Sequence, residues 1–312
     1  HQQKPVIVQN DPWLAPYTDV ISKRQERTGL KEKELIINSN TLSDFATGYL
    51  YFGLHRIPDG WVFREWAPNA VRIYLVGDFN AWEEQEKYRL ESIDNGQWEL
   101  SLPEDALKHQ QHYKLKIYWD GGSGYRIPSY ATRVIQHEDT KVFDAQIWMP
   151  EKPHNWKNKS PEKTHFNPLI YEAHIGMATE KEDIGTFCEF GEQVLPRLSS
   201  AGYNTLQLMA IQEHPYYGSF GYHVSNFFAV SSRFGTPEDL KVLVDKAHGM
   251  GLKVIMDLVH SHSVKNELEG LGKFDGSDTQ YFHAGSRREH VAWDSLCFDY
   301  GKNEVLHFLL SN

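Results

Sequence analysis

The stretch KVIMDLVHSH, residues 253–262, indicates how the second half of the chain folds. It begins as an apolar run and ends in polar residues, which is typical of a buried parallel strand that opens into a loop. Two similar runs precede it, LIYEAH at 169–174 and TLQLM at 205–209, and helical patterns at 190–201 and 236–249 separate the three runs. This order predicts a parallel α/β sheet, with the apolar residues of the third strand buried.

The preceding hundred residues have a different pattern. VRIYLV at 71–76, QWELSL at 97–102 and YKLKIY at 113–118 alternate partly with a period of two, and Gly, Asp and Asn-rich turns separate them. Short alternating segments of this kind predict an antiparallel β-sandwich over residues 46–150.

Two further segments complete the organisation. Residues 1–45 are expected to form a helical arm with a charged, solvated surface. Residues 151–164, which include the polar, proline-bracketed EKPHNWKNKSP, are expected to be a linker. The α/β part then begins at residue 165.

Composition excludes several classes of protein. The 312 residues carry 32 Lys and Arg against 42 Asp and Glu, a formal net charge of −10 that argues against binding nucleic acid. No run of about 18 apolar residues occurs, so no membrane span is expected. Only Cys188 and Cys297 are present, which excludes a disulfide framework and a cysteine-rich zinc site. With no apolar leader at the first residues, a cytoplasmic location is expected. The 13% of aromatic residues suits a carbohydrate protein, but β-rich cores explain it more simply.

Candidate chemistry lies where the third strand ends. Asp257 and His262 come after its apolar run, and polar residues at the carboxyl ends of parallel strands line the sites of such folds. The alternatives are a buried Asp that caps local backbone and a structural Asp–His pair. The loop at 212–233, rich in aromatic residues and glycine, is either a platform for a sugar or an aromatic-packed surface loop.

Other kinds of site lack support. Glu213, His214 and His223 do not have the spacing of a metal-binding helix or strand. No phosphate-binding loop, dinucleotide fingerprint or serine-hydrolase elbow is present. No metal and no cofactor are therefore expected.

Several motifs carry a resemblance to a known family. DLVHSH at 257–262 resembles the first signature of the α-amylase superfamily, in the form found in 1,4-α-glucan branching enzymes, where Ser261 replaces the usual asparagine. The branching-enzyme pattern is also matched by IYEAHIG (170–176), QLMAIQEH (207–214), FGY (220–222) and RFGTP (233–237). REWAPNA (64–70) and GDFNAW (77–82) resemble the carbohydrate-binding module that precedes such barrels.

The resemblance implies a fold and an activity. It implies that residues 165–312 form the first three or so βα units of a TIM (β/α)8 barrel, truncated before the rest. It also implies a retaining glycosyltransferase, which cleaves an α-1,4-glucan and transfers the chain to a 6-hydroxyl to form an α-1,6 branch. The partner would be glycogen, amylose or amylopectin, in the cytoplasm or, for a plant or alga, a plastid. No nucleic-acid or membrane partner and no cofactor would be involved.

The resemblance also assigns residues. Tyr222 matches the tyrosine that stacks under the glucose at the cleavage point, His262 the histidine that hydrogen-bonds that sugar, and Asp257 an aspartate that orients neighbouring polar groups. The further candidates for glucan contacts are Trp61, Trp82, Tyr217 and His214. For the tryptophans of the sandwich, core packing is the alternative.

The chain departs from the family after the third strand. The family's nucleophilic Asp, its acid Glu and a further Asp lie after later strands, in motifs that this sequence does not contain, and EVLHFLLSN at 304–312 resembles the helix before the fourth strand. The chain is thus expected to hold the N-terminal part of such an enzyme and no catalytic residue. The alternatives are a catalytically inactive glucan-binding protein and a debranching relative.

We expect the purified 312-residue chain to form no α-1,6 linkages in amylose, because the carboxylates that would perform the displacement are missing from it. Anomeric proton NMR of the incubated glucan measures this directly. A growing α-1,6 signal, absent from a heat-inactivated sample, would show the expectation to be wrong.

Overall fold

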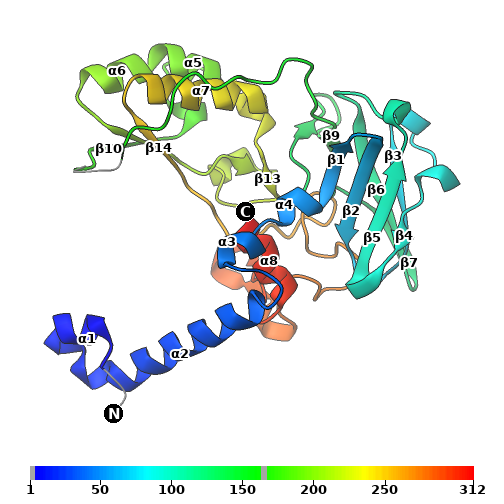
Figure 1. The fold of residues 1–312 in the computed structure, drawn as a ribbon. Coiled ribbons are helices and arrows are strands. Elements are labelled where there is room, and N and C mark those ends of the chain that lie inside the picture. Colours follow the sequence, from blue (N-terminus) through cyan, green and yellow to red (C-terminus); the bar gives the residue numbers. More distant parts are fainter. Residues whose placement is uncertain (1–3, 163–166) are drawn as a thin grey trace. The chain divides into compact units, whose positions relative to one another are not determined.

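The computed structural model describes residues 4–162 and 167–312. The chain divides into two units, one formed by His1–Gly48 with Tyr300–Asn312 and the other by Tyr49–Asp299. Figure 1 shows the ribbon of both units. Among the described residues, no helix is both long and apolar enough to cross a bilayer.

The first unit is helical, as the sequence predicts for the arm, but it includes the other end of the chain. Its helices are α1 (Val6–Asn10), α2 (Thr18–Leu35), α3 (Leu42–Phe45) and α8 (Asn303–Ser311). Asn303 donates to Glu34 at 2.7 Å, and the rings of Phe45 and His307 meet edge to face with centroids 5.0 Å apart. The sequence gives no sign of this pairing, because the two segments lie more than 250 residues apart.

A β-sandwich begins the second unit, as predicted. One antiparallel sheet has the order β1-β2-β5-β4, and the other has the order β3-β6-β9-β8 with β7 on β6. After α4 (Gly48–Tyr51), the strands are β1 (Gly53–Ile57), β2 (Gly60–Trp66), β3 (Ala70–Gly77), β4 (Glu91–Ser92), β5 (Gln97–Leu102), β6 (His112–Trp119), β7 (Gly122–Arg126), β8 (Val134–Gln136) and β9 (Phe143–Gln146).

The alternation seen in the sequence sets the two faces of these strands. Along β6, Tyr113, Leu115 and Ile117 are buried, while Lys114 and Lys116 between them are only half-buried. Successive side chains of a strand point to opposite faces, so a period of two places one row in the core.

The second half of the unit carries the three predicted parallel strands. β10 (Ile170–Ala173), β11 (Thr205–Leu208) and β14 (Lys253–Met256) pair in that order, and Ala173, Leu208 and Met256 share one register. Helices α5 (Phe187–Gln193), α6 (Leu195–Ser200) and α7 (Pro237–Gly249) lie to one side of them (Figure 1). Two small hairpins complete the unit, β12 (Gln212–Glu213) with β13 (Asn226–Val230) and β15 (Glu289–His290) with β16 (Ser295–Leu296).

The core of this half lies between sheet and helices. It is formed by Leu206 and Leu208 of β11 with Phe187, Phe190 and Leu243 of the helices, all fully or almost fully buried. Each of α5 and α7 begins with a capping box, in which a threonine and an acidic residue three positions on satisfy each other's backbone N–H groups.

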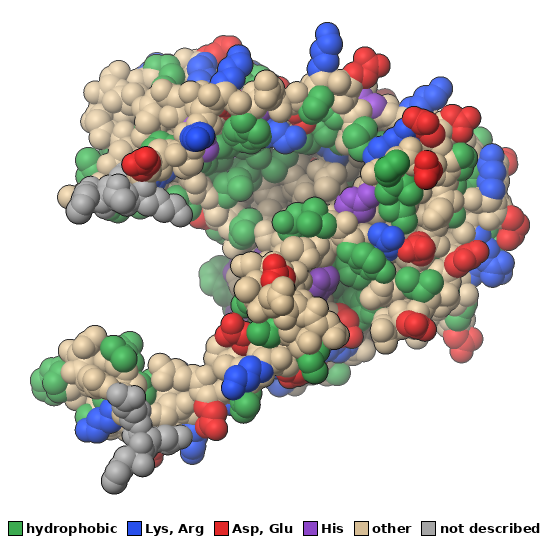
Figure 2. All heavy atoms as spheres, in the orientation of Figure 1, with side chains coloured by type: hydrophobic (Ala, Val, Ile, Leu, Met, Phe, Trp, Pro, Cys, Tyr) green, Lys and Arg blue, Asp and Glu red, His purple; other side chains and the backbone are tan. Residues whose placement is uncertain are grey.

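The expected burial of the third strand is wrong. Ile255, Met256 and Leu258 are 43%, 47% and 49% exposed. Parallel strands are buried when both faces are covered, but β14 is an edge strand and the described helices cover one face only. Figure 2 shows hydrophobic side chains gathered below helices α5–α7, where the other face lies.

The predicted linker is tied to α7 by one carboxylate. Asp245 accepts hydrogen bonds from the backbone N–H groups of Lys157 (2.9 Å) and Asn158 (2.8 Å) and from His154 Nε2 (2.9 Å). Burial alone would raise the pKa of Asp245, but these donors lower it to about 2. Residues 154–158 are thus fixed on the helix although they have no regular secondary structure.

The REWAPNA segment joins the sandwich to the loop that comes after β14. Asn69 donates to both the side chain and the carbonyl of Asp275, at 2.9 and 3.0 Å, and Gln280 donates to the Trp66 carbonyl at 2.7 Å. Beside them Glu65 is fully buried and accepts hydrogen bonds from Trp66 N–H and from Ser129. Burial outweighs these bonds and raises the pKa of Glu65 to about 7.

The raised pKa gives a prediction for stability. The unfolded carboxyl loses its proton near the ordinary glutamate pKa of 4.5, whereas the folded one keeps it to about 7, so the folded state binds more protons between these values. The contribution of Glu65 should therefore lower the free energy of unfolding by about 3 kcal/mol as the pH rises from about 4.5 to 7. Urea unfolding across this range should show a less negative slope of stability against pH in Glu65→Gln than in wild type.

The control is Glu99→Gln, which removes a partly exposed carboxylate paired with Arg64. It should keep the wild-type slope. Parallel slopes for wild type and Glu65→Gln would contradict the raised pKa.

Candidate functional site

The carboxyl edge of the parallel sheet holds a chain of hydrogen bonds around Asp257. Its Oδ1 accepts from Gln207 Nε2 at 2.8 Å, and its Oδ2 accepts from the Tyr222 hydroxyl at 2.9 Å. Gln207 pairs with Ile255 in the sheet, so Gln207 and Asp257 extend from the same face, the one opposite the helices. Sequence reasoning predicts Asp257 and Tyr222 but misses Gln207, although Gln207 lies within the second predicted strand.

Burial and the Asp257 carboxylate raise the pKa of Tyr222 to about 12. Its hydroxyl therefore stays protonated at neutral pH and donates to Asp257. This bond fixes the orientation of a half-buried aromatic ring at the edge of the sheet.

A close backbone approach positions Tyr222. Gly221 has φ of +88°, and a Cβ at this position would lie 1.9 Å from the Ala210 carbonyl oxygen. Only glycine fits here, because it lacks the Cβ and adopts positive φ without strain. The loop can thus turn back onto the end of β11 and bring the next residue over Asp257.

A buried ion pair holds the base of the same loop. Glu213 is fully buried and lies 3.1 Å from Arg233 Nη1, and it also accepts the backbone N–H groups of Ser232 and His214 at 3.0 Å. Arg233 donates further to the carbonyls of His214 and Pro215. Buried charges need such pairing, so both ends of the 212–233 loop are fixed to each other.

His262 lies among other aromatic rings rather than in the Asp257 chain. Its ring centroid is 5.7 Å from that of Trp293 and 6.1 Å from that of His223, and its Nδ1 is 3.4 Å from Ser295 Oγ. Burial and the nearby His223 and His290 lower the pKa of His262. At neutral pH its imidazole is therefore uncharged and can donate or accept one hydrogen bond to a ligand. The alternative of a structural Asp257–His262 pair has no support, because the described contacts of Asp257 go to Gln207 and Tyr222.

The structure places the other two candidates of this loop against buried groups. His214 is fully buried, its Nδ1 contacts the Gln212 carbonyl at 2.8 Å, and burial lowers its pKa to about 4. Tyr217 packs edge to face on His174, with ring centroids 5.9 Å apart. Both residues thus hold the loop in place through contacts with buried groups.

The two candidate tryptophans of the sandwich differ in exposure. Trp61 is only 4% exposed and donates to the Glu104 carbonyl, so the structure favours core packing for it. Trp82 is half-buried, donates to Asp78 at 3.0 Å and lines a cavity of about 590 Å³. The same cavity is lined by His112, His137 and Asp144, which sequence reasoning misses.

Comparisons with known proteins agree with the two halves of the second unit. Residues 51–131 match the family model of carbohydrate-binding module 48 (isoamylase N-terminal domain), and residues 192–289 match that of the alpha amylase catalytic domain. Two pullulanases of known structure share the fold: that of Group B Streptococcus (TM-score 0.69, 18% identity) and that of Bacillus acidopullulyticus (TM-score 0.66, 19% identity). Each alignment covers 83% of this chain, and 39% and 36% of the two pullulanases, respectively.

Sequence relatives are closer. Proteins named 1,4-alpha-glucan-branching enzyme are 47% identical in Dictyostelium discoideum, 45% in Yarrowia lipolytica and 42% in Equus caballus. Each alignment covers 98% of this chain but only 46%, 45% and 44% of those relatives, so the chain spans about half their length.

The position of Gly221 gives a prediction. Gly221→Ala should destabilise the chain by about 2 kcal/mol or more, because the new Cβ meets the Ala210 carbonyl and the backbone must move. Urea unfolding measures the loss. Gly251→Ala is the control: Gly251 also has positive φ, but nothing lies within 4 Å of an added Cβ, so the cost should be roughly 1 kcal/mol. Equal losses in the two variants would contradict the role of the close approach.

Proposed function

Since this chain is homologous over nearly its whole length to 1,4-alpha-glucan-branching enzymes, and carries a carbohydrate-binding module 48 and part of an alpha-amylase catalytic domain, we propose that it belongs to a glycosyltransferase that branches α-glucans. The reaction would be a retaining double displacement in which a glucan 6-hydroxyl replaces water as the acceptor. In this proposal the chain supplies glucan-binding surface, and the substrate is glycogen or the amylose and amylopectin of starch.

The structural observation that carries the proposal is the pair of hydrogen bonds that Gln207 and Tyr222 donate to Asp257 at the carboxyl edge of the sheet. In barrels of this kind the site is built from the loops at that edge. Tyr222 would stack on the apolar face of a glucose ring, because Asp257 holds its hydroxyl and leaves the ring fixed. His262, uncharged at neutral pH, would hydrogen-bond a sugar hydroxyl.

Trp82 extends the proposal to the sandwich. Its indole would pack on a second part of a long glucan, and two contact regions on one chain would favour polymers over short oligosaccharides. The cytoplasm is the proposed location, which the free thiols of Cys188 and Cys297 suit.

Glucan binding by the 312-residue chain tests the edge of the sheet. Tyr222→Ala should weaken the binding of maltoheptaose, measured by isothermal titration calorimetry, by about 1 to 3 kcal/mol, the order of the loss when an aromatic anchor of an interface is truncated. Tyr216→Ala removes an exposed tyrosine from the same loop and should leave the affinity unchanged. If both variants bind like wild type, Tyr222 does not contact the glucan.

Co-sedimentation with glycogen tests the sandwich. Trp82→Ala should lower the bound fraction, because the indole platform is lost while the strands remain paired. Trp156→Ala, which removes a half-exposed indole from the segment on α7, should bind like wild type. An unchanged bound fraction in Trp82→Ala would remove the sandwich from the proposal.

A further inference from the structure

The sandwich brings together three side chains whose types and positions suit a metal ion. We propose that His112, His137 and Asp144 bind one divalent transition-metal cation, with zinc the best match. This site lies apart from the sheet edge that holds Asp257 and adds a ligand that glucan binding does not require.

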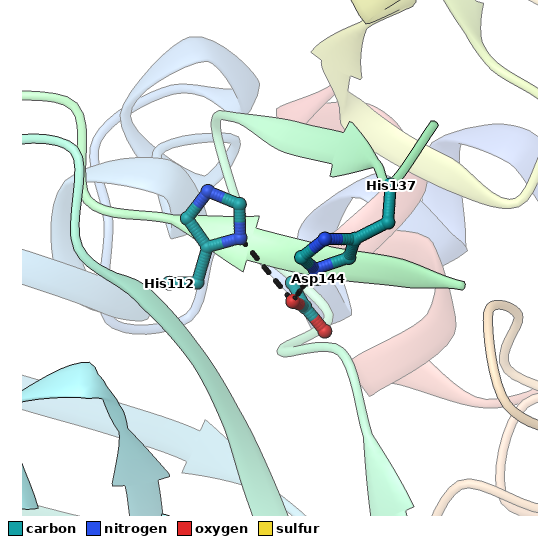
Figure 3. Close-up of side chains that lie close together, drawn as sticks. All are labelled: His112, His137 and Asp144. Carbon is teal, nitrogen blue, oxygen red and sulfur yellow. Dashed lines mark hydrogen bonds and ion pairs between the residues drawn. The ribbon is translucent and has the colours of Figure 1, made fainter. Parts of the chain in front are cut away.

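The geometry is close to that of a ligand set. His112 Nδ1 lies 3.2 Å and His137 Nε2 lies 2.5 Å from the same oxygen, Asp144 Oδ2. Figure 3 shows both rings turned toward this carboxylate. One ligand atom from each residue lies within 4.8 Å of the other two. Tetrahedral zinc, with ligands at about 2.0 to 2.2 Å, needs ligand atoms about 3.3 Å apart, so shifts of about an ångström suffice.

The sheet fixes the backbone of these residues. His112, at the start of β6, is paired with Gln146 of β9. Asp144 of β9 is paired with Ile135 of β8, and His137 directly follows the last residue of β8. Neighbouring strands with a set register hold their side chains at fixed separations. The cation would therefore meet a site assembled before it binds, which lowers the entropic cost of binding.

The surroundings orient the ligands and leave room for a fourth. Asp144 is almost fully buried, and Lys114 Nζ contacts its other oxygen at 3.0 Å, which orients Oδ2 toward the two rings. Side chains that hold the second oxygen of a ligand in this way are common around metal sites. The cavity of about 590 Å³ that these residues line leaves room for a water as fourth ligand. Finally, two imidazoles and one carboxylate form a ligand set that zinc accepts readily.

The competing interpretation is a hydrogen-bonded cluster without metal. In it, each ring donates a proton to Asp144 Oδ2, and Lys114 balances the charge. A metal would replace the two protons that lie between the rings and the carboxylate, so the two interpretations differ in whether the chain takes up a cation at this cluster.

Titration of the metal-free 312-residue chain distinguishes them. Zn²⁺ binding is measured by calorimetry, and Co²⁺ binding by the visible absorption of tetrahedrally coordinated cobalt. Wild type should take up one ion with the cobalt spectrum. His137→Gln and His112→Gln should each weaken uptake more than about 10-fold and lose that spectrum. Histidine variants are preferred to Asp144→Asn, which would remove the carboxylate that pairs with half-buried Lys114.

His283→Gln is the matched control, because His283 also pairs with a carboxylate, Asp299 at 3.6 Å, but is not in the cluster. It should bind metal like wild type. Circular dichroism and thermal melts without metal confirm that each variant is folded. The proposal is overturned if wild type takes up no Zn²⁺, or if uptake persists undiminished in both His112→Gln and His137→Gln.

Discussion

The parallel register of β10, β11 and β14 is the constraint on which the site depends. Because parallel strands end on the same edge, residues that come after them meet there even when they are far apart in sequence. Gln207 and Asp257, fifty positions apart, share one hydrogen bond for this reason. The loop that supplies Tyr222 returns to this edge because Gly221 permits it and the buried Glu213–Arg233 pair anchors it.

Buried carboxylates recur in the second unit, and their surroundings decide their charge. Glu65 accepts hydrogen bonds from Trp66 and Ser129, but full burial outweighs them and raises its pKa to about 7. Asp245 accepts hydrogen bonds from three residues of the 154–158 segment, and these bonds lower its pKa to about 2. The first lies where the sandwich meets the loop after β14, and the second fixes the predicted linker on α7. The balance between burial and hydrogen-bond donors therefore sets the direction in which each pKa moves.

The sandwich has two features of functional interest on one cavity. Trp82 belongs to the segment that resembles a carbohydrate-binding module, while the neighbouring His112, His137 and Asp144 have the chemistry of a cation site. The cluster uses the outer side of the sheet that contains β6, β8 and β9, where the alternating pattern leaves polar side chains outside the core. This face is available for ligands because the other row of residues already fills the core.

Periodicity and local motifs are enough to predict the sandwich, the three parallel strands and the positions of Asp257 and Tyr222, because each of these is encoded in neighbouring residues. The pairing of α8 with the arm, the hydrogen bonds from residues 154–158 to Asp245 and the cluster around Asp144 emerge only when the chain is folded. The same is true of the exposure of Ile255 and Met256, since burial depends on which faces other segments cover. These features join residues distant in sequence, whose contacts depend on strand order and packing and leave no periodic signal.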